Sequence, residues 1–438
     1  MTTRFDPSGP LRGSLRPPPD KSVSHRAALI AAMAEGETTI EGYLDAADTR
    51  STLEAVMALG ATVDGTGGGA IEPTLRMRGV GLRGVAAAAI DVGNAGTLLR
   101  LLPGWLAGQE TGGWTLDGDA SIRRRPVDRI AAPLRLMGAR LECRDERLPP
   151  LRIEAAPLRG IEYEMPVASA QVKSCLLFAG LLAEGKTRIA EPLPSRDHSE
   201  RMLAAAGAEI ERGDGTVSVR PAVRLEPGEI AVPADFSSAA FFVLAALLVP
   251  GSDVTLAAVG LNPTRTGLLA ILDRMGAKIE VEPTGERGGE PSGRLRIRPS
   301  RLRGVEVGGV DVPLAIDELP LVALAACFAE GETTIRDAAE LRRKESDRID
   351  TVSEALRALG ATVETSEDGM RITGSGGLTG GAIDSHGDHR IAMLGAIAGL
   401  ASRDGVEVAG MDAAAVSYPG FEADLASLRA PGPPVRET

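Results

Sequence analysis

Two kinds of helix are predicted along the chain from the spacing of its apolar residues. The first kind is apolar on nearly every side, so we expect these helices to be buried inside a domain. The second kind is amphipathic, because residues such as Leu53, Val56 and Leu59 recur on one helical face. Clear examples of the first kind are residues 26–34, 176–183, 239–249 and 321–329.

Each amphipathic helix ends in a Gly-Ala step that leads into a predicted strand. A glycine just past a helix allows the left-handed backbone turn that closes it. The nearly identical phrases at residues 34–40, 183–189 and 329–335 precede three of these helices, which indicates an internal repeat. The glycines of the five steps are Gly60, Gly138, Gly207, Gly276 and Gly360.

Six copies of helix–strand–helix–strand–strand, each about 70 residues long, account for nearly the whole chain. The sixth copy is truncated, because Pro-Gly-Pro-Pro follows Leu428 where a Gly-Ala step is expected. Residues Gly9–Leu15 resemble a strand without a partner, so we expect the start of the chain to complete the last copy.

This pairing predicts an α/β protein of two domains, each with buried helices and outer sheets. Repeats one to three occupy residues 20–233, and repeats four to six occupy residues 234–431 together with residues 1–19. The chain crosses between the domains near residues 18–20 and 232–235, where we expect hinges. A cleft between two such domains is a natural place for a ligand.

The composition narrows the classes of partner. The length of 438 residues and the 43% of hydrophobic residues indicate a globular protein. The net charge of −12 makes the binding of nucleic acid or an anionic membrane surface unfavourable. Cys143, Cys175 and Cys327 have no metal-like spacing, and the last two lie in apolar stretches as expected of buried thiols. The apolar run 239–249 is too short to span a bilayer and the N-terminus lacks an apolar signal core, so we expect a cytoplasmic protein.

Cations gather at the predicted helix starts, where backbone N–H groups favour anions. Lys344 and Arg348 are four residues apart, so we expect them to share a helix face, where they repel by about 4 kcal/mol at 4 Å. Bound anions would relieve this repulsion, and so would the nearby carboxylates Asp317, Glu318 and Glu345, which leaves a purely structural role open. The cations concerned are Lys21, Arg26, Arg100, Arg125, Arg196, Arg342, Arg343, Lys344, Arg348 and Arg390.

Two further patterns exclude common sites. Residues Gly93–Thr97 have neither the dinucleotide-binding glycine spacing nor a P-loop Gly-Lys-Ser/Thr, and a plain turn remains an alternative. His386 and His389 have no third ligand nearby, so no metal is expected.

Together these motifs resemble the enolpyruvyl transferases, and specifically the 5-enolpyruvylshikimate-3-phosphate synthase (3-phosphoshikimate 1-carboxyvinyltransferase) family. The resemblance covers residues 10 to about 428. Its fold is two domains of three βαβαββ units. The motifs that carry it are Asp20–Arg26, Gly93–Thr97, Arg125-Pro126, Ser169–Ser174, Ser195–His198, Asp317–Pro320, Arg343–Arg348 and Gly387–Arg390.

The resemblance implies transfer of the enolpyruvyl group of phosphoenolpyruvate to the 5-hydroxyl of shikimate 3-phosphate, in the shikimate pathway to aromatic amino acids. Asp317 is the implied base, Glu345 the implied proton carrier at the methylene carbon, and Lys21 an assistant. No metal or organic cofactor is implied. The residues implied for phosphoenolpyruvate are Lys21, Gly96, Arg125, Gln171, Arg348 and Arg390. Those implied for shikimate 3-phosphate are Ser22, Arg26, Ser169, Ala170, Gln171, Arg196, Asp317 and Lys344.

The sequence departs from the family pattern in places. Val416 stands where many relatives have a lysine, which puts that phosphoenolpyruvate contact in doubt, and Ala170 stands where some have serine. Gly96 is the residue of glyphosate-sensitive relatives, so we expect inhibition by glyphosate. The implied cations divide between the two halves, so we expect the domains to close on substrate, and we expect a monomer.

Three alternatives are less well supported. The sister family that acts on UDP-N-acetylglucosamine has Lys-Asn at the first helix start and a reactive cysteine in the Arg-Pro loop. Here Ser22 follows Lys21, and residues 118–121 contain no thiol. A nucleic-acid-binding protein is disfavoured by the acidic charge and few aromatics, and a non-catalytic scaffold would leave Asp317 and Glu345 without a role.

Overall fold

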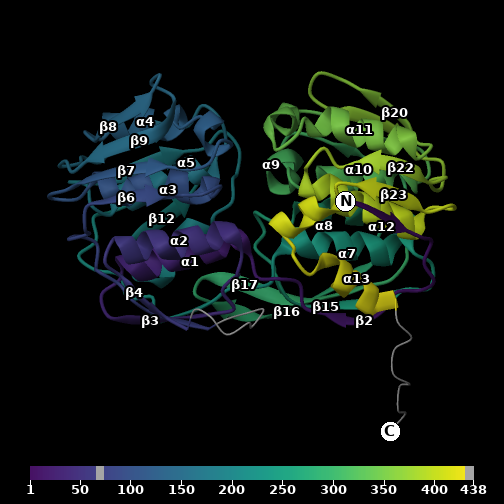
Figure 1. Ribbon diagram of the computed structural model, residues 1–438, viewed down its shortest axis with the longest axis horizontal. Helices are drawn as coiled ribbons and strands as arrows, with labels where there is room; N and C mark the ends of the chain where they lie inside the picture. Colours follow the sequence, from purple (N-terminus) through teal and green to yellow (C-terminus); the bar gives the residue numbers. More distant parts are fainter. Residues whose placement is uncertain (66–73, 430–438) are drawn as a thin grey trace, which may run out of the picture. The chain divides into compact units, whose positions relative to one another are not determined.

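The computed structural model describes residues 1–65 and 74–429, and its architecture is the predicted α/β repeat (Figure 1). The first repeat contains α1 (Lys21–Met33), β3 (Glu37–Glu41), α2 (Ala47–Ala58), β4 (Thr62–Asp64) and β5 (Leu75–Arg78). The second contains β6 (Ala88–Asp91), α3 (Gly96–Ala107), β7 (Gly113–Asp117), η1 (Ile122–Arg124), α4 (Asp128–Leu136), β8 (Arg140–Arg144) and β9 (Leu148–Glu154). The third contains β10 (Glu162–Glu164), α5 (Ala170–Gly180), β11 (Thr187–Ala190), α6 (His198–Ala205), β12 (Ile210–Gly213) and β13 (Thr216–Val219), and β14 (Glu229–Ala231) follows it.

The second half repeats this order. The fourth repeat contains α7 (Phe236–Leu248), β15 (Asp253–Gly260), α8 (Gly267–Arg274), β16 (Ile279–Arg287) and β17 (Glu290–Ile297). The fifth contains β18 (Glu306–Val307), α9 (Asp311–Ala315), α10 (Leu319–Cys327), β19 (Glu332–Ile335), η2 (Ala339–Arg343), α11 (Arg348–Ala358), β20 (Thr362–Thr365) and β21 (Met370–Thr373). The sixth contains β22 (Gly381–Asp384), α12 (His389–Ala401), β23 (Val406–Ala409), η3 (Met411–Val416) and α13 (Phe421–Arg429). Two strands, β1 (Thr2–Phe5) and β2 (Arg12–Leu15), precede all six.

Each repeat builds one sheet with the same strand order. In the second repeat, β6 pairs in parallel with β7, and β9 lies antiparallel between β7 and β8. Two parallel strands that follow each other in the chain need a crossover connection, and in repeats two, three, five and six the buried helix supplies it. The same order, with the lead strand at the edge, recurs in the four-stranded sheets of repeats one to five.

The prediction for the N-terminal strand was wrong in one respect. The strand expected at Gly9–Leu15 forms as β2, but it pairs with β15 of the fourth repeat, from Arg12 opposite Asp253 to Leu15 opposite Leu256. The start of the chain completes the sixth sheet through Thr2–Phe5 instead, which pairs antiparallel with β23. Strand β14 correspondingly leads the sheet of repeat one beside β3. The Pro-Gly-Pro-Pro segment lies outside the described residues.

Two compact units result. One holds residues 1–18, 234–285 and the chain from 292 onward, and the other holds residues 19–233 and 286–291. The second set includes the tip of the β16–β17 hairpin, which the sequence did not indicate. Residues 430–431 of the predicted second domain lie outside the described part of the chain.

The all-round apolar helices are buried, as predicted. Every residue of α7 except Leu248 is buried, and α7, α10 and α12 contact one another in one core. In the other core, α3 contacts both α1 and α5. Cys175 and Cys327 lie within these cores, and burial raises the pKa of the Cys327 thiol to about 12, which agrees with the expected buried thiols.

The five predicted left-handed glycines are also confirmed. Gly60, Gly138, Gly207, Gly276 and Gly360 have φ between 91° and 109°. At the first of them, the N–H of Gly60 donates to Met57 O at 2.9 Å and that of Ala61 to Val56 O at 3.0 Å, which closes the helix end. Among the described residues, no helix is long and apolar enough to cross a membrane.

Candidate active site

The predicted site residues lie in both units: around Asp317 in one, and around Arg26, Gly96 and Lys21 in the other. Each unit is described by itself. In the unit built on repeats four to six, the centre is Asp317, which directly precedes the cap of α10. Its Oδ1 lies 3.4 Å from Lys344 Nζ and 3.5 Å from Arg348 Nη1. Its Oδ2 lies 3.5 Å from Arg265 Nη1. Three cations therefore surround this carboxylate at ion-pair distances.

Arg348 is the most deeply buried of these cations, with 1% of its side chain exposed. Its Nε donates to Asp388 Oδ2 at 2.9 Å, and its Nη2 donates to Glu345 Oε2 at 2.8 Å. Burial alone would raise the pKa of Asp388, but the charge and hydrogen bond of Arg348 outweigh it and lower that pKa to about 2. Burial would also raise the pKa of Glu345, but the charge of Arg348 and a backbone hydrogen bond, with smaller effects, together lower it. Both carboxylates are therefore held ionised at neutral pH.

Asp388 also fixes the start of α12, because its Oδ1 accepts the N–H of Arg390 at 2.9 Å. Anionic side chains at a helix N-terminus stabilise it through the backbone N–H groups and the helix dipole. The adjacent His389 stays neutral, since burial and the Arg390 charge lower its pKa to about 4.

Arg390 reaches back to the same centre. Its Nη1 donates to the backbone carbonyl of Asp317 at 2.9 Å, and its Nη2 donates to Ser237 Oγ. Ser237 Oγ in turn donates to the fully buried Glu318. Lys344, Arg348 and Arg390 thus meet at Asp317, and Glu345 joins them through Arg348.

Several members of this cluster were not predicted. Arg265 lies 3.5 Å from the carboxylates of Asp235, Asp317 and Glu318 and is buried. It lies in a loop before α8 that matches no motif. Asp235 and Ser237 stand at a predicted helix start, which was the only available signal for them.

The geometric reason given for pairing Lys344 with Arg348 was wrong. Asp347 caps α11 by accepting the N–H of Ile349 at 3.2 Å and that of Asp350 at 3.3 Å. The helix therefore begins at Arg348, and Lys344 lies outside it, at the end of the short helix η2. The two cations meet at Asp317 instead of on one helix face.

In the other unit, Arg26 joins three helices. Its Nε donates to Ser199 Oγ of α6 at 2.8 Å, its Nη1 to the Ser22 carbonyl at 2.9 Å, and its Nη2 to Ser174 Oγ of α5 at 3.0 Å. Ser174 Oγ donates to the Ala170 carbonyl at 2.6 Å. Arg26 therefore bonds Ser22 directly and is linked to Ala170 through Ser174.

The pKa of Arg26 is lowered to about 10, chiefly by burial, with a further contribution from the charge of Arg196. The Glu200, Asp20 and Glu290 charges act in the opposite direction. Arg196, in the loop before α6, is thus close enough to Arg26 to be felt electrostatically. Ser169 caps α5 by accepting the N–H of Val172 at 3.4 Å.

A second group surrounds Gly96 at the start of α3. A Cβ atom on Gly96 would lie 2.7 Å from Arg125 Nη1 and 3.2 Å from Arg100 Nη1. Arg125 Nη2 donates to Asn94 Oδ1 at 2.9 Å, and Arg100 Nη1 donates to Gln171 Oε1 at 3.1 Å. Gly96, Arg125 and Gln171 therefore lie together, held by Asn94 and Arg100, which the sequence analysis named but assigned to neither substrate.

Lys21 opens α1, and its Nζ lies 3.1 Å from Asp48 Oδ2, a partner that no motif indicated. Burial and the Lys21 charge lower the pKa of the neighbouring His25 to about 3, so this histidine is neutral. Its Nδ1 lies 2.6 Å from Thr52 Oγ1. Val416, the departure noted near the C-terminus, is 59% exposed at the end of η3.

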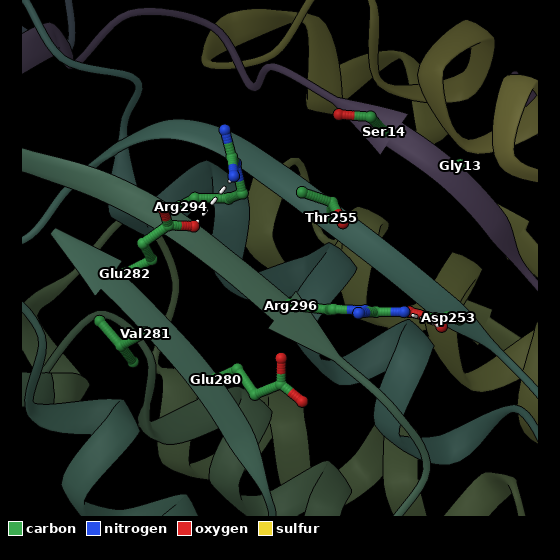
Figure 2. A pocket seen from close by; sticks show the side chains of 9 residues that line it. All are labelled: Gly13, Ser14, Asp253, Thr255, Glu280, Val281, Glu282, Arg294 and Arg296. Atoms are coloured by element: carbon green, nitrogen blue, oxygen red, sulfur yellow. Dashed lines mark hydrogen bonds and ion pairs between the residues drawn. The ribbon is translucent and has the colours of Figure 1, made fainter. Parts of the chain in front are cut away.

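A hollow lies on the sheet of repeat four (Figure 2). Residues of β2, β15, β16 and β17 line it, and most of the charged side chains among them form ion pairs with one another. Arg296 bonds Asp253 at 2.8 Å and Arg294 bonds Glu282 at 2.9 Å. None of the predicted site residues lines it, so we assign it no part in the chemistry. Among the described residues, no group of three or more His, Cys, Asp or Glu side chains could hold a metal ion.

Comparison with known proteins gives one consistent result. The sequence model of the EPSP synthase (3-phosphoshikimate 1-carboxyvinyltransferase) family matches residues 5–425. The 3-phosphoshikimate 1-carboxyvinyltransferase of Alkalilimnicola ehrlichii is 50% identical over 424 residues, which are 96% of this chain and 94% of that protein. The enzyme of the same name from Desulforudis audaxviator is 47% identical over 432 residues, 98% of this chain and 100% of that protein.

Solved structures agree with the sequence comparison. An EPSP synthase from Acinetobacter baumannii superimposes with a TM-score of 0.89 at 42% sequence identity, and the match covers 98% of both chains. The two-domain repeat fold expected from the sequence is therefore the fold of these relatives.

Proposed function

The chain belongs to the EPSP synthase (3-phosphoshikimate 1-carboxyvinyltransferase) family, and we propose that its cation clusters hold the substrates of that reaction. The enzyme transfers the enolpyruvyl group of phosphoenolpyruvate to the 5-hydroxyl of shikimate 3-phosphate, releasing phosphate, in aromatic amino acid biosynthesis. The transfer to a UDP-sugar is not favoured, because every relative named above carries the shikimate activity.

The observation that supports the site assignment best is the environment of Asp317. Its carboxylate lies 3.4–3.5 Å from the side-chain nitrogens of Lys344, Arg348 and Arg265, which hold it in place. A carboxylate held in this way can accept the 5-hydroxyl proton of shikimate 3-phosphate as that oxygen attacks C2 of phosphoenolpyruvate. We therefore assign Asp317 as the general base.

Glu345 is the proposed proton carrier at C3. Addition places a proton on the methylene carbon, and elimination of phosphate removes one again to form the enol ether. Because Arg348 lowers its pKa, Glu345 is suited to the second step, in which it accepts the C3 proton. Lys21 is proposed to assist in supplying the proton of the first step.

The remaining predicted cations bind anionic groups. We assign Arg348, Arg390, Arg125 and Lys21, with Gly96 and Gln171, to phosphoenolpyruvate. Guanidinium groups match carboxylate and phosphate oxygens in two-pronged geometry and stabilise the charge on the departing phosphate.

Shikimate 3-phosphate is assigned to the Arg26 group and to the residues around Asp317. The proposed contacts are Ser22, Arg26, Ser169, Ala170, Gln171, Arg196, Asp317 and Lys344.

Phosphate release tests both the reaction and its substrate. We expect release from phosphoenolpyruvate with shikimate 3-phosphate, and none when UDP-N-acetylglucosamine replaces it. Release only with the UDP-sugar would refute the proposal. We also propose that the enzyme acts as a monomer in the cytoplasm, and a dimer in sedimentation velocity at assay concentration would contradict the first part.

A further inference from the structure

The tip of the β16–β17 hairpin makes contacts that the repeat pattern does not require. Residues 286–291 group with residues 19–233, whereas the hairpin residues on either side of the tip group with the other half of the chain. The tip is therefore a fourth-repeat segment that is part of the unit built on repeats one to three.

At this tip Glu290 is buried against His198. Glu290 Oε1 lies 2.9 Å from His198 Nδ1, and only 1% and 2% of the two side chains are exposed. A buried carboxylate is costly unless it is paired and hydrogen-bonded, and removing its partner is strongly destabilising. The pair therefore fixes the tip and the first residue of α6 relative to each other.

Backbone contacts and surface ion pairs also hold this hairpin tip in place. A Cβ atom on Gly289 would lie 2.5 Å from the Arg201 carbonyl of α6, and its φ of +85° already favours glycine. Arg287 Nη1 donates to Glu41 Oε2 of β3 at 2.7 Å, and its Nη2 donates to Glu229 of β14. The tip thus adjoins α6, β3 and β14.

The start of α6 carries part of the proposed shikimate 3-phosphate site. His198 is followed by Ser199, whose Oγ accepts a hydrogen bond from Arg26 at 2.8 Å, and it is preceded by the loop of Arg196. Lys173 also holds this segment, with Nζ 2.7 Å from Glu200 Oε1 and 3.3 Å from the Ser195 carbonyl.

We propose that Glu290 is a positioning residue for shikimate 3-phosphate, acting through His198 to hold Ser199, Arg26 and Arg196 in place. The proposal rests on the assignment of Arg26 and Arg196 to that substrate. Glu290 touches no substrate in this scheme. Its negative charge also partly offsets the cost of burying Arg26.

Two substitutions separate the charge from the hydrogen bond. Glu290→Gln keeps an acceptor for His198 but removes the charge, and Glu290→Met removes both with little change in volume. Glu282→Gln makes the same charge change on an exposed part of the same hairpin and is the control. Steady-state phosphate release measures KM for each substrate separately, and calorimetry measures shikimate 3-phosphate binding directly.

We expect KM for shikimate 3-phosphate to rise about threefold in Glu290→Gln and about tenfold in Glu290→Met, as for loss of a hydrogen bond to a charged group. KM for phosphoenolpyruvate and kcat should stay within about twofold, and Glu282→Gln should match the wild type. The His198→Gln variant tests whether Glu290 acts through His198. If it does, a variant that combines His198→Gln with a Glu290 substitution should bind shikimate 3-phosphate no more weakly than the weaker-binding of its two single variants.

Equal increases in KM for both substrates would overturn the inference, and so would a lower kcat with unchanged KM. A merely structural role of Glu290 predicts these results. Unchanged shikimate 3-phosphate affinity in Glu290→Gln would also overturn the inference, even if Glu290→Met failed to fold. The proposed function would be unaffected by that result. A wild-type protein that neither binds nor turns over shikimate 3-phosphate would overturn the proposed function and this inference together.

Discussion

Replacing Gly96 by alanine tests how closely Arg125 is held against the start of α3. The added Cβ would lie 2.7 Å from Arg125 Nη1 and 3.2 Å from Arg100 Nη1. Ordinary contacts to carbon are about 3.5 Å, so the Arg125 guanidinium must move by roughly 0.8 Å. A shift of that size away from Asn94 would break the 2.9 Å hydrogen bond that orients it.

The cost follows from the role assigned to Arg125. A hydrogen bond to a charged group, such as the one assigned between Arg125 and phosphoenolpyruvate, contributes about 1.5–3 kcal/mol. This corresponds to roughly a 10- to 100-fold change in binding. Because the Arg125 side chain is flexible and can recover part of its contact with phosphoenolpyruvate, we expect KM for that substrate to rise about tenfold. KM for shikimate 3-phosphate should change less than about twofold, since the Arg26 group does not contact Gly96.

The assay is steady-state phosphate release at saturating shikimate 3-phosphate, with and without glyphosate. We expect the wild type to be inhibited and Gly96→Ala to need a higher glyphosate concentration for the same inhibition. Gly213→Ala, in the same unit, adds a Cβ with nothing within 4 Å and is the matched control. An unchanged KM for phosphoenolpyruvate in Gly96→Ala would refute the reasoning, and full wild-type activity in millimolar glyphosate would refute the expected sensitivity.

Two further predictions each concern a single side chain. Asp317→Asn should lower kcat by about 10²- to 10⁴-fold, as expected for loss of a general base, while calorimetry still detects shikimate 3-phosphate; near-normal kcat would exclude the assigned role. The pKa of His25 is lowered from 6.5 to about 3 in the folded protein, so the unfolded chain binds more protons between these values and wild-type stability falls as pH falls from about 6.5 to 3. Urea unfolding should therefore show that wild type loses about 3 kcal/mol more than His25→Gln between pH 7 and pH 4, and equal losses would contradict the buried neutral histidine.

The elements that the sequence predicted best depend on local patterns. Gly60 and its four equivalents adopt positive φ because a helix end of this kind requires it, whatever surrounds it. The all-round apolar helices are buried because no exposed placement would hide their side chains. The meeting of Lys344, Arg348 and Arg390 at Asp317 followed from motifs, although the helical argument for the first two failed at the Asp347 cap.

The elements that were missed depend on contacts between distant segments. Nothing in residues 9–15 specifies β15 as their partner, because strand pairing is decided by the assembled sheet and not by local preference. Arg265 and Asp48 lie in stretches without a motif, and only the fold brings them to Asp317 and Lys21. Cap residues could have given one further correction: an Asp before a helix is a strong start signal, and Asp347 marks the start of α11 at Arg348.

The two strands at the beginning of the chain also have consequences for synthesis on the ribosome. Strand β2 pairs with β15 at residues 253–256, and β1 pairs with β23 at residues 406–409. At about 5–20 residues per second, β1 waits roughly 20–80 s for its partner to be made. The unit of residues 19–233 can assemble most of its core in that interval, while residues 2–5 are among the last to be placed. A nascent chain stalled before residue 406 should therefore carry an unpaired N-terminal strand, open to proteases and chaperones, beside a half that is already largely folded.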